Sequence, residues 1–123
     1  MNIFKKLFGG QKTTEEVRET KEKGFDKVKY EGVRALRMHQ FDLAAKFLEQ
    51  ALQLNAEDLE CRDYLSQAYI SMGDLQQAYA QLQKISEAQT DNIAVLLRMA
   101  DVAYMMEDYI AMTDVCDKAL QLD

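Results

Sequence analysis

Few residues in this chain have the types and spacing that catalysis or metal binding requires. His39 is the single histidine, and Cys61 and Cys116 are 55 residues apart. No CxxC or HExxH pattern occurs, so the sequence offers no metal site with the usual ligand spacing. No nucleophile stands near a base in the sequence. We therefore expect no enzyme activity, no metal and no cofactor, with His39 in an exposed turn and Cys116 as a small core residue.

Two further patterns are weak candidates for chemistry. Gly10-Gln11-Lys12-Thr13 is similar to part of a phosphate-binding loop, but it lacks a glycine directly before the lysine and a preceding strand. Four acidic residues also gather near the start of an expected helix: Glu57, Asp58, Glu60 and Asp63. Acidic side chains are favourable at a helix N-terminus, which explains most of this cluster without a bound cation. Neither pattern predicts a site.

Composition limits the fold and the class of partner. The chain has 48% hydrophobic and 29% charged residues, no proline and five glycines, which disfavours both disorder and a turn-rich all-β fold. Its net charge of −6 disfavours nucleic acid as a partner. No apolar run is long enough to span a bilayer, and Lys5 and Lys6 interrupt what would be the core of a signal peptide. We expect a cytoplasmic location.

The elements that position the remaining side chains come from a repeat of 34 residues. Residues of similar size recur at this offset in three copies without insertion or deletion. The recurring columns are Gly32, Ser66 and Ala100; Phe41, Leu75 and Tyr109; Ala44, Ala78 and Met112; and Leu48, Leu82 and Cys116. Within each copy the apolar positions step by three and four residues, which indicates helices.

The periodicity predicts six helices and the turns between them. The expected ranges are 25–38, 41–54, 58–72, 75–88, 92–106 and 109–122. Asp74 and Asp108, and Asp91 with Asn92, stand at the starts of three of these helices and are expected to cap them. Gly73 is expected to end the helix before it.

These columns resemble the tetratricopeptide repeat, whose unit is a helix–turn–helix of 34 residues. The small residues at 32, 44, 66, 78 and 100 match positions where that family packs its helices closely. The resemblance implies an all-α fold, an α-solenoid of three helix–turn–helix units in a right-handed superhelix. The units would span residues 25–58, 59–92 and 93–123.

The resemblance also implies a function and a set of binding residues. Members of the family line a concave groove with the first helix of each unit, so we expect a non-catalytic scaffold that binds a peptide or helix of another protein. The implied groove residues are Lys29, Val33, Leu36, Arg37, Asp63, Gln67, Ile70, Leu97, Asp101, Tyr104 and Met105. The alternative is a solvated helix face without a ligand.

One subfamily clamps the carboxylate tail of heat-shock chaperones. Its clamp requires Lys, Asn, Asn, Lys and Arg at positions where this chain has Lys29, Val33, Tyr64, Ala94 and Arg98. Two matches leave too few donors to hold a carboxylate. Because residues 25–123 carry a net charge of −8, we expect a basic or neutral peptide to bind better than an acidic one.

The start of the chain has a different character. Residues 1–12 form a basic amphipathic leader, in which Ile3, Phe4, Leu7 and Phe8 share one helical face and two lysines lie opposite. Three interpretations remain open: a disordered tail, a segment that docks on this or a neighbouring repeat domain, and a hook for a membrane surface or a partner. Residues 13–24 are a candidate N-terminal capping helix, because Thr13 and Glu16 have capping-box spacing.

The other end of the chain is rich in methionine and lacks the extra capping helix usual in the family. Two interpretations remain open for Met99, Val102, Met105, Met106 and Met112: core residues that fill gaps, or an apolar face through which the chain forms a homodimer. The chain could also be part of a longer array. Besides the scaffold, the sequence therefore permits a structural homodimerisation module or a membrane-surface adaptor recruited through residues 3–8.

Overall fold

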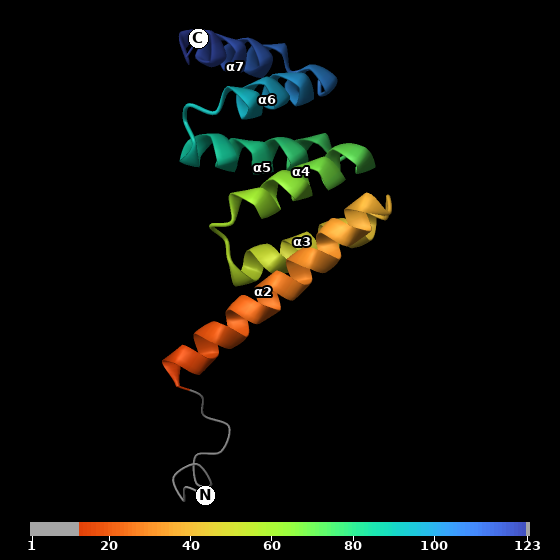
Figure 1. The fold of residues 1–123 in the computed structure, drawn as a ribbon. Helices are drawn as coiled ribbons and strands as arrows, with labels where there is room; N and C mark the ends of the chain where they lie inside the picture. The colour runs from red at the N-terminus through yellow and green to blue at the C-terminus, as the bar shows by residue number, and fades with distance from the viewer. Residues whose placement is uncertain (1–12, 123) are drawn as a thin grey trace, which may run out of the picture.

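A computed structural model describes residues 13–122 of the chain. Within that range the chain forms six α-helices and no strand: α2 (Thr14–Arg37), α3 (Phe41–Leu54), α4 (Leu59–Met72), α5 (Leu75–Ala88), α6 (Ile93–Met105) and α7 (Tyr109–Leu122). Consecutive helices pack against one another, so that the pairs stack in chain order from α2 to α7 (Figure 1). The predicted all-α solenoid is confirmed.

The first helix is longer than the periodicity predicts. It begins at Thr14 with a capping box. The hydroxyl of Thr13 accepts a hydrogen bond from the amide of Glu16, and the carboxylate of Glu16 accepts one from the amide of Thr13. Gly24 lies inside this helix and does not end it. The expected separate capping helix at 13–24 is therefore absent as such. The side chains of residues 13–23 are exposed and do not cover the first helix pair.

Two of the three predicted helix starts have the expected side-chain cap, and at α6 it is Asn92 rather than Asp91 that provides it. Asn92 and Asp108 accept the amides of Val95 and Ala111, at 3.2 and 3.1 Å. Asp74 does not make the expected side-chain bond. An N-cap residue needs extended backbone for its side chain to reach back to the helix. The ψ of Asp74 is 73°, which is farther from extended backbone than the ψ of 91° at Asn92.

The turns inside the helix pairs share one backbone conformation. Gly73 has a φ of +78°, and His39 and Glu107, one repeat before and after it, both have a φ of +61°. His39 is exposed, as expected for a turn residue. Its particular role is to adopt the left-handed conformation that ends a helix, a position usually given to glycine.

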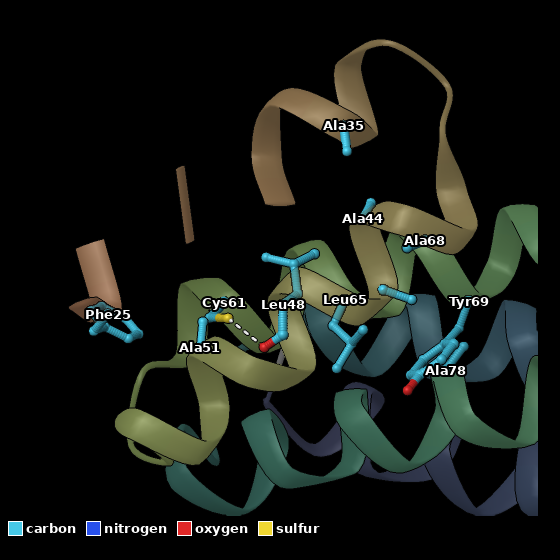
Figure 2. Close-up of a cluster of buried hydrophobic side chains, with 11 residues drawn as sticks. Phe25, Ala35, Ala44, Leu48, Ala51, Cys61, Leu65, Ala68, Tyr69 and Ala78 are labelled. Atoms are coloured by element: carbon cyan, nitrogen blue, oxygen red, sulfur yellow. Dashed lines mark hydrogen bonds between the residues drawn. The ribbon is translucent and has the colours of Figure 1, made fainter. Parts of the chain in front are cut away.

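Small residues let the helices approach closely in the core. Gly32 of α2 faces the fully buried Leu48 of α3, and its repeat counterparts Ser66 and Ala100 are buried as well. Figure 2 shows the first core cluster, which runs from Phe25 to Ala78. A second cluster joins α5, α6 and α7 and includes Met99 and Val102, which therefore serve as core residues.

Cys61 is sealed within the first cluster. Its thiol donates to the carbonyl of Leu48 at 3.4 Å (Figure 2), and burial raises the pKa of Cys61 to about 11. Cys116 is only partly covered.

Two glycine substitutions should have opposite effects on stability. A Cβ at position 32 would lie 2.7 Å from Cγ of Leu48, whereas one at position 24 would meet nothing closer than 3.8 Å. Gly32→Ala should lower the free energy of unfolding by about 1–3 kcal/mol through overpacking. Gly24→Ala should raise it by about 0.5–1 kcal/mol through helix propensity. Urea denaturation followed by circular dichroism measures both, and a stable Gly32→Ala chain would contradict the described packing.

The two thiols should differ in reactivity. At mildly alkaline pH, Ellman's reagent should modify Cys116 rapidly and Cys61 only as the protein unfolds, because the buried thiol stays protonated. The measurement compares native and urea-denatured protein. Equal native rates would show that Cys61 is accessible.

Candidate partner-binding surface

The candidate surface is the face shared by α2, α4 and α6, the first helices of the three pairs. We call it the first-helix face and define it by the eleven residues that the sequence implied for the groove. The structure divides these residues into three groups. Some form ion pairs between helices, some pack on the core, and the rest are exposed.

Lys29 is the best-held side chain of this face. Its ammonium lies 2.9 Å from a carboxylate oxygen of Asp58 and 2.8 Å from one of Glu60, both at the start of α4, and 5.6 Å from the ring centre of Phe25. Burial alone would lower the pKa of Lys29, but the hydrogen bonds and charges of Glu60 and Asp58 outweigh it and raise the pKa above 10.5. Lys29 therefore ties α2 to α4 and is not a free cation for a partner.

The position equivalent to Lys29 on the next first helix also forms an ion pair, with the charges reversed and a different partner position. Asp63 of α4 accepts a hydrogen bond from the guanidinium of Arg98 on α6. Arg98 and Lys29 are the two residues that match the carboxylate clamp of the chaperone-binding subfamily. Both are held by carboxylates of this chain, which is a second reason why the face does not form that clamp.

The apolar members of the face are split between the core and the solvent. Val33, Leu36 and Ile70 are half-buried and pack against the core clusters. Arg37, Gln67 and Asp101 are not buried in the core. Three residues of α6 are exposed: Leu97 at 52%, Tyr104 at 61% and Met105 at 48%. The structure therefore leaves α6 as the apolar part of the accessible face.

Two features of this face were not foreseen from the sequence. Tyr30 is 65% exposed and occupies the repeat column of Tyr64 and Arg98, so the 34-residue offset was the signal that would have found it. Asp58 has two functions, because its carboxylate also accepts the amide of Cys61 and caps α4. The sequence indicated that acidic residues stand near the N-terminus of this helix, but it did not indicate the contact between Asp58 and Lys29.

The described part of the chain shows no other chemical centre. Within residues 13–122, no three His, Cys, Asp or Glu side chains gather where they could hold a metal ion. No helix in that range has the length and hydropathy to cross a bilayer. The leader residues Ile3, Phe4, Leu7 and Phe8 lie outside the described residues.

Comparison with known proteins decides the family. A model of the tetratricopeptide repeat matches residues 35–101, more than half of the chain. The chain belongs to the tetratricopeptide repeat family. The family is generally a non-catalytic protein-interaction fold. No curated protein matches the chain in sequence.

Solved tetratricopeptide structures share the fold at low sequence identity. The Arabidopsis OM64 domain superposes with a TM-score of 0.71 and is 20% identical, covering 84% of this chain and 85% of that one. The Sgt2 domain from Aspergillus fumigatus gives 0.68 and 19%, over 80% and 65% of the two chains. PcrH, solved in complex with the chaperone-binding region of PopB, gives 0.71 and 16%, over 82% of each.

The ion pairs of Lys29 should make a measurable contribution to stability. Lys29→Met should lower the free energy of unfolding by about 1–2 kcal/mol, because it leaves two carboxylates without their cation. Lys27→Met, at an exposed position on the same helix, is the control and should change it by less than about 0.5 kcal/mol.

The contribution of Lys29 should also depend on pH. Because the folded-state pKa lies above the unfolded value of 10.5, the contribution is complete below pH 10.5 and disappears as the pH rises through the folded pKa. The difference between the parent chain and Lys29→Met should therefore be constant at neutral pH and shrink above pH 10.5. A difference that grows in alkali would contradict the assignment.

Proposed function

We propose that the first-helix face binds a peptide or helix of another protein, without catalysis. The segment it takes combines apolar anchors with at least one basic residue. Tyr104 and Met105 would receive the anchors, and Asp101 would pair with the base. The family assignment supports the class of function, and PcrH is a protein of the same fold that was solved with a segment of another protein.

The observation that carries the proposal is how the charges on this face are used. Lys29 and Arg98, two cations that could hold an acidic partner, are bound to Asp58, Glu60 and Asp63. Asp101 remains exposed and makes no ion pair among the described residues. Arg37 is the exposed cation that this face keeps for an acidic peptide, since Lys29 and Arg98 already have carboxylate partners, whereas a basic peptide meets the accessible carboxylate of Asp101 beside the exposed apolar residues of α6.

The spacing on α6 supports a single binding strip. Leu97, Asp101, Tyr104 and Met105 follow one another at helical steps of four, three and one, so they share one face of the helix. The opposite face carries the buried Val95, Leu96, Met99 and Val102. The exposed strip is thus not the core side of an amphipathic helix. It mixes aromatic, thioether and carboxylate groups, a combination common at peptide-binding surfaces.

A selection from a random peptide display library tests this function. Peptides retained by the intact chain should be enriched in Lys or Arg next to apolar residues. Synthetic versions should bind Asp101→Lys at least about fivefold more weakly by fluorescence anisotropy, since a basic peptide then meets a like charge. Asp114→Lys makes the same charge change on the exposed side of α7 and is the matched control.

Two outcomes would contradict the proposed function. One is a selected consensus rich in Asp or Glu. The other is equal loss of binding in Asp101→Lys and Asp114→Lys, which would show an effect of net charge alone. Tyr104→Ala distinguishes a binding strip from general electrostatics, because it removes an anchor without changing the charge.

A further inference from the structure

The last helix pair leaves an apolar face uncovered within the described residues. On α5, Leu82 and Ile85 are 0% and 3% exposed because they pack in one cluster with Val95, Leu96 and Met99 of α6. Their counterparts one repeat later are Cys116 and Ala119 of α7. Ala119 is itself only 8% exposed and Cys116 is partly buried. They line a depression of about 450 Å³ together with Ile93, Leu97 and Leu120, and the exposed apolar surface there belongs to the two leucines. We call these five residues the end face. Leu120 is its most exposed member, at 70%.

A repeat column shows what kind of contact this face is built for. Lys29, Asp63 and Leu97 are equivalent residues on α2, α4 and α6. The first two reach forward to the next first helix, where they meet Asp58 and Glu60, and Arg98. The third is apolar and has no following helix in the described chain. The column therefore carries an exposed apolar residue on α6, where α2 and α4 carry charged residues that form ion pairs.

The rim of the end face is acidic. Asp101 lies one turn after Leu97, and Asp117 lies one turn before Leu120, so both carboxylates are on the same helix faces as the depression. Both are exposed. Lys118 lines a different depression, between α5 and α7. Arg98, the other base of this helix pair, is held by Asp63. A segment that fits here has apolar side chains and flanking positive charges.

The chain contains one segment with that composition. Ile3, Phe4, Leu7 and Phe8 are spaced to share one helical face, and Lys5 and Lys6 lie between them. Residues 1–12 contain three lysines and no acidic residue. The segment's four apolar residues match the apolar lining of the depression, and its lysines match the acidic rim.

We propose that residues 3–8 of one copy of the chain bind the end face of a second copy. The short linker favours a second copy over the same copy as the binding site. Residues 9–13 span at most about 18 Å when extended. They start from the free end of α2, a helix about 36 Å long, which lies at the opposite end of the stack from α7 (Figure 1). The contact joins two different surfaces, so it is heterologous and propagates into rings or chains.

Light scattering on the intact chain and two variants tests this contact. The intact chain should self-associate with increasing concentration. A chain lacking residues 1–8 and the variant Leu120→Glu should each remain monomeric, because each has lost one half of the contact. Burying a carboxylate at Leu120 should weaken association at least about tenfold. Leu43→Glu changes an exposed leucine on α3 and should associate like the parent.

Mixing the two monomeric variants gives the decisive measurement. Leu120→Glu keeps the leader, and the truncated chain keeps the end face, so an equimolar mixture should form heterodimers and nothing larger. If the truncated chain still dimerises, the end faces bind each other and the proposal is wrong. If the intact chain stays monomeric but floats with anionic phosphatidylserine vesicles through residues 1–8, the leader binds membranes and the proposal is also wrong.

The natural Cys116 allows a direct check of proximity. In the variant Phe4→Cys, oxidation with diamide should join the introduced thiol of one chain to Cys116 of another, since two thiols are oxidised to one disulfide as diamide is reduced to its hydrazine. Peptide mapping should identify this linkage between positions 4 and 116. Phe4→Cys combined with Cys116→Ser should not form it, and buried Cys61 should not take part. Linkage of the introduced thiol only to its own counterpart in another chain would overturn the proposed contact. These readouts need no peptide ligand, so they are independent of the proposed function.

Discussion

A helix pair of this kind has apolar residues on the side where the next pair must lie, and the whole structure depends on covering that side. Leu82 and Ile85 are sealed only because α6 packs over them. The helices approach closely because the column of Gly32, Ser66 and Ala100 keeps side chains small at the contact. Each pair is thus stabilised mainly by its neighbours, as expected for a solenoid.

The stacking of one pair on the next also determines how charges are paired. Lys29 and Asp63 occupy equivalent positions on α2 and α4, and each pairs with residues of the next first helix, α4 or α6. These bonds fix how one first helix lies on the next, and they also pair two cations of this surface with carboxylates of the chain. Stacking and partner selection are therefore linked in this chain. A side chain that forms an ion pair between two helices is less available to a ligand. The ion pairs within the chain therefore influence which charges the face offers to a partner.

Much of this fold could be predicted from residue spacing alone. The 34-residue columns place five helices to within a residue or so, because apolar periodicity reports the side that packs. The same signal is silent for residues 14–23, whose side chains are exposed, so the continuous α2 was missed. Gly73 was a visible turn signal, whereas His39 and Glu107 adopt the same positive φ without being glycine. The repeat offset relates all three positions. The binding residues were harder to predict, because only the register of α2, α4 and α6 shows that Lys29 and Asp63 are already engaged across helices.

The two ends of the stack differ in chemistry, which gives the molecule a direction. At one end the first ten residues of α2 are exposed and, apart from Val17, polar, with Arg18 paired to Glu15 at 2.7 Å on the same helix. At the other end, Leu97 and Leu120 lie beside a depression with little polar lining. Leu97 belongs to both the end face and the first-helix face, and Asp101 of the first-helix face lies on the rim of the end face. A segment bound at Leu120 leaves Arg37, Gln67 and Tyr104 accessible. The two contacts therefore meet at Leu97 and Asp101 of α6, and a copy bound at the end face leaves the α2 and α4 parts of the partner-binding surface open.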